Sequence, residues 1–324
     1  MYERYKDLDC YTSTSNWSIK TENDYVEFSL DLPEGTSKGT MYHLLPGITL
    51  IYFDMNASML PEVPKENTSQ NLVQFNYCVN GRIEMLLDDN TYLYMSENDY
   101  SISKQDAGSA SFFPTRLYQG ISLYFDMHTL SNSNHPIYES FDLDFSQLDE
   151  LYFAKKGTYI AEANKEFKTL IEKLWALYET PSTFYIKHYL IELLHLLLED
   201  EHHTEKNITF YTNVQVEIAK KTEKLLTTNL HKHIPIRLLA EQFSVSETSL
   251  KNYFRSVYGQ NISEYLRSLR MNLASKLLTE TDLPISEISI QIGYTKQGKF
   301  AAVFKKQFGL APLEYRRMKH LEET

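Results

Sequence analysis

Two stretches near the C-terminus, FRSVYGQNISEYLRSLR (residues 254–270) and FKKQFGLAPLEYRRMKH (304–320), repeat one pattern at a constant offset of 50. Five residues are identical in the two copies and keep the same spacing: Phe254 and Phe304, Gly259 and Gly309, Glu264 and Glu314, Tyr265 and Tyr315, Arg267 and Arg317. Upstream, LLAEQFSVS (238–246) lies over EISIQIGYT (287–295) at an offset of 49. Such a repeat indicates two copies of one structural unit.

Each copy has the pattern of a helix-turn-helix unit, in which a turn of three residues separates a short helix from a second one. We expect helices over 236–243 and 247–258 in the first copy, and over 285–292 and 296–308 in the second. Between them, residues 261–281 are predicted to form one long helix. Twenty residues at 1.5 Å each span about 30 Å, close to the roughly 34 Å of one turn of duplex DNA. The second helix of each unit is therefore predicted to enter one of two successive major grooves.

These residues resemble the DNA-binding domain of the AraC/XylS family of bacterial transcription regulators. The resemblance covers residues 217–318 and is most specific in the second copy, where it rests on Ile288, Gly293, Tyr294, Phe300, Phe304, Lys305, Phe308, Gly309, Pro312, Tyr315 and Arg316. It implies a cytoplasmic, sequence-specific DNA-binding regulator, more often an activator than a repressor, with duplex DNA and RNA polymerase as partners.

The first helix-turn-helix unit is predicted to recognise the DNA sequence. Thr248, Lys251 and Asn252 lie opposite the apolar positions of their helix, where Lys can reach guanine and Asn can bond adenine in two places. Gln297 is the corresponding candidate in the second unit. The family usually has polar or Arg side chains where this chain has Ala301 and Ala302, so we expect the second unit mainly to position the protein. The candidate DNA-backbone contacts are Arg255, Lys296, Lys299, Lys305, Lys306 and Arg316.

Charge is divided unequally along the chain. The net charge is −11 for all 324 residues, but residues 1–210 carry 15 Lys and Arg against 32 Asp and Glu, a net of −17. Residues 211–324 carry 17 against 11, a net of +6. This asymmetry indicates two domains with different partners, the basic one facing a polyanion.

The acidic half is predicted to begin with short antiparallel strands. Runs rich in β-branched and aromatic residues alternate with turn residues, and Asn80-Gly81 between two runs predicts a hairpin. We therefore expect an α+β chain: a cupin-like β-barrel with two helices, then an all-α domain of two helix-turn-helix units joined by a long helix. The expected divisions are a regulatory domain (1–200), a linker (201–212) and a DNA-binding domain (213–324).

Two amphipathic helices are predicted between 161 and 200. The second has a wide apolar stripe, and the family's regulatory helices often form a dimer. A homodimer is therefore expected, through residues Tyr189, Leu190, Leu193, Leu194 and Leu197. The alternative reading is that both helices simply cover the barrel.

Several function classes are not supported by the composition. The longest nearly apolar stretch, residues 189–198, is about half the roughly twenty residues of a membrane span, and the charged N-terminus lacks a signal-peptide pattern. The two cysteines, Cys10 and Cys78, cannot form a disulfide framework. In the strand region only His43 and His128 could ligate a metal. We expect no enzyme activity, metal or cofactor.

A small-molecule effector in the N-terminal domain is implied by the resemblance. Its class stays open among sugars, aromatic acids, fatty acids and siderophores. Because pockets are mostly apolar and aromatic, the candidate lining residues are Tyr52, Phe75, Tyr77, Tyr94 and Tyr124. The alternative function is a ligand-independent DNA-binding regulator whose acidic half recruits a protein partner.

Overall fold

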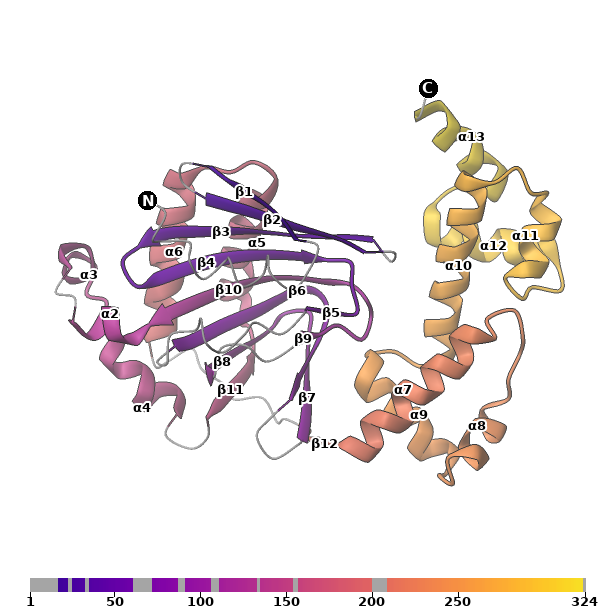
Figure 1. Cartoon of the computed structure of the whole chain (residues 1–324), viewed down its shortest axis with the longest axis horizontal. Helices are drawn as coiled ribbons and strands as arrows, with labels where there is room; N and C mark the ends of the chain where they lie inside the picture. The colour runs from indigo at the N-terminus through magenta and orange to yellow at the C-terminus, as the bar shows by residue number, and fades with distance from the viewer. Residues whose placement is uncertain are drawn as a thin grey trace. The chain divides into compact units, whose positions relative to one another are not determined.

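The computed structural model describes residues 17–22, 25–32, 35–60, 72–86, 91–105, 111–132, 135–153, 157–199 and 209–322. The chain divides into two compact units, residues 1–210 and 211–324. Figure 1 shows that the first unit contains the β-sheet with α5 and α6 behind it, and that the second unit is built of helices.

The elements of the first unit are β1 (Trp17–Thr21), β2 (Tyr25–Leu32), β3 (Gly35–Leu45), β4 (Ile48–Met55), β5 (Met59–Leu60), β6 (Leu72–Leu86), β7 (Thr91–Ser96), β8 (Asp99–Gln105), β9 (Ser111–Phe112), β10 (Tyr118–Asp126), α2 (Met127–Asn132), α3 (Pro136–Ser140), the 3-10 helix η3 (Phe145–Gln147), α4 (Leu148–Phe153), β11 (Thr158–Glu162), α5 (Lys165–Glu179) and α6 (Thr183–Leu198).

The strands form an antiparallel sheet that stays open. Neighbouring strands follow the order β1-β2-β3-β4-β10-β6-β7, and β8 joins β6 to β11. In the described residues this path does not close on itself, so the expected barrel is found only as an open antiparallel sheet. The α+β composition of the chain is as predicted, whereas the cupin-like character is not established.

The sequence at Asn80-Gly81 does not form the predicted hairpin, because β6 runs through it from Leu72 to Leu86. Gly81 has a φ of +86°, and a Cβ atom there would lie 2.0 Å from the carbonyl oxygen of Leu117. The register with β10 shifts between Gln119 and Gly120, across from this point. Glycine is therefore required for a bend where two backbones approach closely, and not for a chain reversal.

The main core lies between the sheet and the helices α5 and α6. Tyr52 and Phe75 are fully buried in it and Tyr77 is 2% exposed. The Tyr52 hydroxyl donates a 3.0 Å hydrogen bond to the Leu174 carbonyl on α5, and the Phe75 ring packs 6.3 Å from that of Phe167. These three aromatic residues belong to the core, contrary to the expectation that they line a ligand pocket.

Tyr94 and Tyr124 are not members of this core. The Tyr94 hydroxyl donates to Glu84 Oε2 at 2.7 Å. Tyr124 receives a 2.9 Å hydrogen bond from Gln74 Nε2 on the neighbouring strand.

The apolar stripe of α6 also packs into the core of its own unit. Leu190, Leu193, Leu194 and Leu197 are each at most 1% exposed and lie in the main core. Tyr189 is partly exposed and stacks on Tyr185, with ring centroids 6.2 Å apart. The predicted dimer surface is therefore corrected: its four leucines cover the sheet, which is the alternative that the sequence left open.

The second unit consists of the short β12 (Tyr211–Thr212) and seven helices among its described residues: α7 (Asn213–Thr228), α8 (Ile236–Gln242), α9 (Glu247–Tyr258), α10 (Ile262–Glu280), α11 (Ile285–Gln291), α12 (Gln297–Phe308) and α13 (Pro312–Glu322). The helices α8 to α12 lie where the repeat predicts them, to within one or two residues at each end.

Candidate nucleic-acid interface

The first helix-turn-helix unit is formed by α8 and α9. The chain turns at Ser244, which has a φ of +55°, and the next amide, of Val245, donates to the Ala240 carbonyl at 3.0 Å. Ala240 is 3% exposed, and a small side chain there allows the two helices to approach closely. Ser246 then caps α9 by accepting a 3.0 Å hydrogen bond from the Ser249 amide.

The second helix-turn-helix unit, formed by α11 and α12, repeats this turn. Gly293 has a φ of +88°, and the amide of Tyr294 donates to the Ser289 carbonyl at 2.9 Å. Each of these residues lies 49 positions after its counterpart in the first turn, and Ser289 is 1% exposed. A Cβ atom on Gly293 would lie 2.9 Å from the His231 carbonyl oxygen. The internal repeat of the sequence is thus a repeat of structure.

The helix α9 has one buried and one exposed face. Leu250, Phe254, Val257 and Tyr258 are buried, whereas the base-reading candidates Thr248, Lys251 and Asn252 are exposed, as is Arg255. Lys251 Nζ lies 3.4 Å from Glu247 Oε2 one turn away. An exposed pair of this kind contributes little, so Lys251 can exchange it for a contact with DNA.

The exposed face of α12 differs from that of α9. Phe300 and Phe304 are fully buried at the positions equivalent to Leu250 and Phe254. The positions equivalent to Thr248, Lys251 and Asn252 are Gly298, Ala301 and Ala302, none of which has a side-chain hydrogen-bonding group. The polar candidates on and beside α12 are exposed: Lys296, Gln297, Lys299, Lys305 and Lys306.

The two recognition helices also begin differently. Lys296 is the N-cap residue of α12 and makes no side-chain capping hydrogen bond, and no acidic residue lies in the first turn. The first turn of α9 has the Ser246 cap and Glu247. The start of α12 therefore combines first-turn amides that no side chain caps with positive side chains, which favours a phosphate contact.

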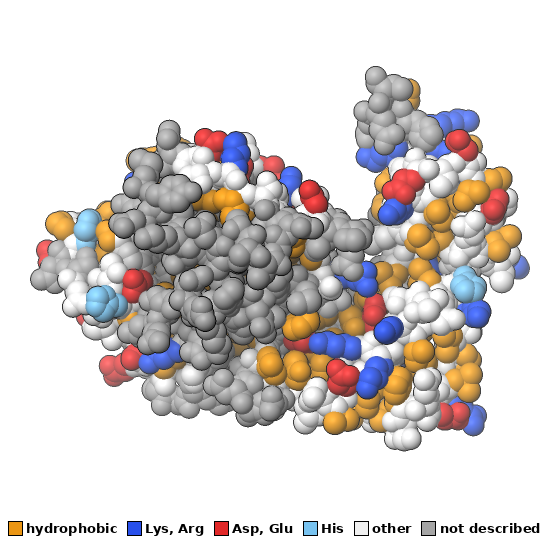
Figure 2. Space-filling view, in the orientation of Figure 1, with side chains coloured by type: hydrophobic (Ala, Val, Ile, Leu, Met, Phe, Trp, Pro, Cys, Tyr) orange, Lys and Arg blue, Asp and Glu red, His pale blue; other side chains and the backbone are white. Residues whose placement is uncertain are grey.

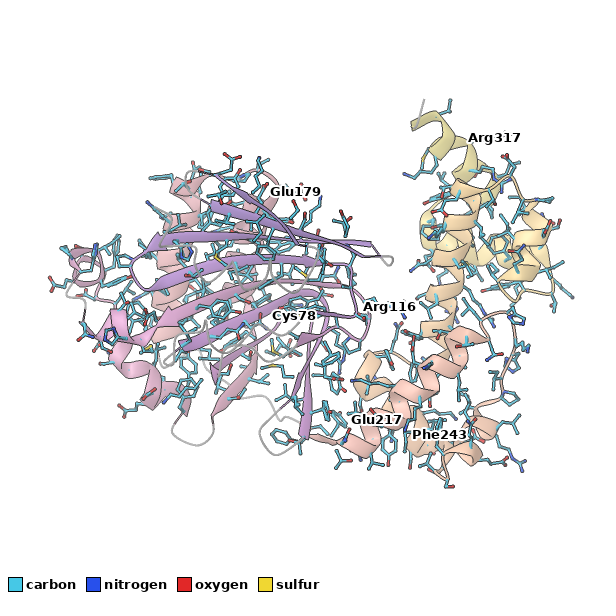
Figure 3. All side chains as sticks on the ribbon, in the orientation of Figure 1. Cys78, Arg116, Glu179, Glu217, Phe243 and Arg317 are labelled. Carbon is cyan, nitrogen blue, oxygen red and sulfur yellow. The ribbon has the colours of Figure 1, made fainter. Side chains whose placement is uncertain are left out.

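Arg316 departs from its predicted role as a DNA-backbone contact. Its guanidinium donates from Nε to the Leu278 carbonyl at 3.2 Å and from Nη2 to the Leu283 carbonyl at 2.7 Å. Two of its donors are thus used to join α13 to the end of α10. Arg317, labelled in Figure 3, is exposed on α13 and is the freer cation of the pair.

Arg270, which is not among the predicted site residues, has the same kind of role beside the first helix-turn-helix unit. It donates from Nε to the Leu230 carbonyl at 2.9 Å and from Nη2 to the Lys232 carbonyl at 3.0 Å. The repeat gives no signal for this residue, because Arg270 and Arg316 are 46 positions apart and not 50.

Positive charge is distributed over the second unit. In the view of Figure 2, Lys and Arg side chains lie among acidic and hydrophobic ones and do not gather in one patch. Among the described residues no group of three or more His, Cys, Asp or Glu side chains is arranged to hold a metal ion. No helix in the described part of the chain is long and apolar enough to cross a membrane.

The chain is similar to known regulators over this second unit. A family model described as a helix-turn-helix domain matches residues 239–318. The HTH-type transcriptional activator RhaR of Enterobacter sp. (strain 638) is 31% identical over 104 residues, which are 32% of this chain and 37% of RhaR. The regulatory protein SoxS of Salmonella typhimurium is 33% identical over 100 residues, 31% of this chain and 94% of SoxS.

One solved structure, the C-terminal domain of AraT from Geobacillus stearothermophilus, has 30% sequence identity and covers 31% of this chain and 84% of its own, with a TM-score of 0.30. The match to RhaR spans little more than a third of that relative. SoxS, in contrast, is matched over nearly its whole length. With its repeated helix-turn-helix units, the chain belongs to the AraC/XylS family of DNA-binding transcription regulators.

Proposed function

We propose that this protein is a sequence-specific transcription activator whose DNA-binding domain (213–324) binds duplex DNA and whose regulatory domain (1–200), followed by a linker (201–212), responds to a small-molecule effector. The observation that carries the proposal is the structural repeat of two helix-turn-helix units around α10, with the same turn hydrogen bond in each and polar side chains exposed on both second helices.

The geometry of α10 supports binding to one face of the duplex. Its 19 residues correspond to about 28 Å at 1.5 Å per residue, near the roughly 34 Å repeat of the major groove. The helices α9 and α12 flank it in the sequence as equivalent members of the repeat. Each is therefore assigned one of two successive major grooves.

Because their exposed side chains differ, we assign different roles in DNA binding to α9 and α12. Thr248, Lys251 and Asn252 supply hydrogen-bonding groups for base edges. Gly298, Ala301 and Ala302 cannot do so, although an alanine methyl can touch a thymine methyl. We assign sequence reading mainly to α9, with Gln297 as a single further reader, and phosphate contacts to Arg255, Lys296, Lys299, Lys305 and Lys306.

The activator role rests on the names of relatives: RhaR is called a transcriptional activator, and a Staphylococcus xylosus relative that is 31% identical over 131 residues is called a lactose operon transcription activator. RNA polymerase is the partner that activation requires. A homodimer remains part of the proposal, but the α6 leucines are unavailable to form it because they are buried.

Selection of binding sites from random duplex DNA with the full-length protein tests this function. The expected product is one short, well-defined motif for α9, with weak preference about one helical turn away for α12. Affinity for the selected site should fall steeply with salt, because phosphate contacts release counterions. Equal binding to selected and shuffled sequences would contradict sequence-specific recognition.

A transcription assay with RNA polymerase then tests activation. Transcription from a promoter with the selected site should rise when the protein is added. Response to added metabolites separates the effector-dependent regulator from the ligand-independent alternative, for which the output would be the same under all conditions.

A further inference from the structure

A pocket of about 330 Å³ lies between α10 and α12. Its walls come from the turn after α9, from the first half of α10 and from the second half of α12. The residues that line it, called the junction pocket below, are Gln260, Glu264, Arg267, Ser268, Val303, Lys306 and Gln307. The junction pocket therefore combines residues from both helix-turn-helix units with residues of the helix that joins them.

The lining of the junction pocket is almost entirely polar. Of its described lining residues only Val303 is apolar, whereas sites for small metabolites are mostly apolar and aromatic. Two side chains are cations, Arg267 and Lys306, and the amide and hydroxyl groups come from Gln260, Gln307 and Ser268. Side chains of these types make most protein contacts to DNA phosphates. The lining therefore favours a phosphate group over an apolar ligand.

The two cations are available for an anion. Arg267 and Lys306 are both exposed, and neither forms an ion pair or a side-chain hydrogen bond with another described residue. Arg267 lies near the turn of the second helix-turn-helix unit: burial raises the pKa of the Tyr294 hydroxyl, and the charges of Arg270 and Arg267 oppose this rise. The guanidinium of Arg267 is thus carried by α10 but lies beside the second helix-turn-helix unit.

The carboxylate of the junction pocket has a structural role. Glu264 Oε2 accepts a hydrogen bond from the Asn261 amide at 3.4 Å, and Asn261 Oδ1 accepts one from the Glu264 amide at 2.9 Å. This capping box holds the carboxylate at the start of α10. With two cations and one carboxylate the junction pocket has a net charge of +1, which still favours an anion.

Lys306 connects the junction pocket with the exposed face of α12. It lies one helical turn after Ala302, at the edge of the face that is assigned to the major groove. The next residue, Gln307, donates from Nε2 to Asn272 Oδ1 on α10 at 3.3 Å. This bond ties the end of α12 to α10 and holds the backbone that carries Lys306 beside Arg267.

The place of the junction pocket in the chain matches the part of the duplex between two major grooves. Two successive major grooves on one face of DNA are separated by a minor groove, which the two sugar-phosphate backbones border. A protein with α9 in one major groove and α12 in the next must cover a backbone between them. The junction pocket follows α9, continues along α10 and ends on α12, so its residues lie between the two recognition helices.

We propose that the junction pocket binds one phosphate group of the DNA backbone between the two major grooves, with Arg267 as its main ligand and Lys306 as its second. A guanidinium can donate two parallel hydrogen bonds to a phosphate. The inference rests on the proposed function and adds to it a contact made by the joining helix. Because both helix-turn-helix units contribute to the pocket, this one phosphate holds them at a fixed spacing on the duplex.

The salt dependence of DNA binding tests the charge contact. With the full-length protein and a non-specific duplex, Arg267→Ala should lower the slope of log K against log salt concentration by about 1. Lys276→Ala is the matched control, because Lys276 is exposed on the same helix but pairs with Glu280 at 3.9 Å and does not line the pocket. Its slope should equal that of the parent. Equal slopes for the parent and Arg267→Ala overturn the proposal.

Uncharged methylphosphonate groups, placed one at a time along a duplex that carries the selected site, locate the phosphate. At one position between the two grooves, the substitution should weaken binding by the parent and by Lys276→Ala about tenfold, the effect of losing a hydrogen bond to a charged group. It should hardly affect Arg267→Ala, which already lacks the cation. If the parent and Arg267→Ala lose affinity at the same positions by the same factors, the assignment of Arg267 is wrong.

Glu264→Gln tests the junction pocket through a gain of binding. Glutamine serves as the N3 residue of a capping box, as Gln215 does in α7, so stability should not change. Removing the negative charge should strengthen DNA binding about two- to fivefold, as expected for an exposed charge pair. Glu314→Gln makes the same charge change at the equivalent position of the repeat, where Glu314 Oε2 accepts from the Ala311 amide at 3.0 Å outside the pocket. An equal gain from both variants would assign the effect to total charge and contradict the proposal.

Competition at constant ionic strength distinguishes DNA phosphate from a free phosphate compound. Inorganic phosphate and pyrophosphate should not displace the duplex from the parent protein. Displacement that is lost in Arg267→Ala would assign the pocket to a free anion and overturn the DNA assignment. If no motif can be selected from random duplexes, sequence-specific function fails, whereas the salt slope on non-specific duplex still decides whether the junction pocket binds a DNA phosphate.

Discussion

Arg270 and Arg316 make the same pair of contacts in the two helix-turn-helix units. Each donates from Nε and from Nη2 to two backbone carbonyls at or just beyond the end of the helix that precedes its helix-turn-helix unit, α7 for Arg270 and α10 for Arg316. Of the four accepting carbonyls, that of Leu278 lies in the last turn of α10, where carbonyls lack intrahelical partners, and the other three lie in the connections that follow α7 and α10. At the offset of 50, Arg270 corresponds to His320 and Arg316 to Leu266, so the two contacts resemble each other without occupying equivalent positions of the repeat.

Arg316→Ala should destabilise the second unit by about 1.5–3 kcal/mol, the range for hydrogen bonds to charged groups. Arg316→Lys should restore little, because one ammonium cannot donate in the two fixed directions of the fork. Denaturant unfolding of the full-length protein followed by circular dichroism measures both. The exposed neighbour Arg317 is the control, and equal loss from Arg317→Ala would contradict the assignment.

Asn252→Ala should relax base preference at one or two positions of the selected site and weaken binding to that site by about 1–3 kcal/mol. Lys305→Ala should weaken all sequences alike and reduce the salt slope by about 1. Site selection and salt titration with each variant provide the comparison. If Asn252→Ala selected the same motif as the parent, α9 would not be reading bases through this residue.

Much of the second unit could be predicted from sequence because its signals are local. A turn of fixed length, a glycine with positive φ and the spacing of Phe254 and Phe304 recur in register, and each copy supports the interpretation of the other. The contacts of Arg316 could not be inferred this way, because they depend on which helix end lies beside it in three dimensions.

Less of the first unit could be predicted from the sequence, because its sequence patterns fit more than one structure until the neighbouring strands and helices are known. Asn80-Gly81 has the composition of a hairpin, but the close approach of Leu117 makes it a bend within one strand. In the segment VQFNY (73–77) the aromatic residues were predicted to line a pocket, but they face the main core. The polar residues Gln74 and Asn76, which alternate with them, lie on the opposite face of the strand. An apolar stripe on a helix indicates that this face is buried. It does not indicate whether the face packs on a sheet of the same domain or on a second copy of the protein.

The uncapped start of α12 predicts an exchange of DNA affinity for stability. Lys296→Ser should supply the missing N-cap, as Ser246 does for α9, and stabilise the second unit by about 1 kcal/mol. It should also weaken binding to all DNA sequences by removing a cation. Lys299→Ser removes an equal charge within the helix without adding a cap, so it should weaken DNA binding with no gain in stability. Equal stability of the two variants would contradict the capping argument.

Because the leucines of α6 are buried, replacing one of them should lower the stability of the first unit. If they formed a dimer surface, the same replacement would instead change the association of the protein. Leu193→Ala should destabilise the first unit by about 2–5 kcal/mol through cavity formation, since Leu193 is fully buried. Phe184, on the same helix, is 73% exposed, so Phe184→Ala should leave stability nearly unchanged. Unfolding is measured alongside sedimentation, and a stable Leu193→Ala protein with altered mass would restore the dimer interpretation.

Alkaline pH should unfold the first unit before the second. Burial raises the pKa of Tyr124, Tyr138 and Tyr178 to about 12, above the 10.0 of a free tyrosine. A raised folded-state pKa contributes stability that is complete below the unfolded pKa and is lost as the pH rises toward the folded value, here between pH 10 and about 12. Both tryptophans, Trp17 and Trp175, belong to the first unit. Tryptophan fluorescence should therefore change across this range before the helical circular dichroism of the second unit does, whereas simultaneous loss of both signals would show that buried tyrosines do not set the alkaline limit.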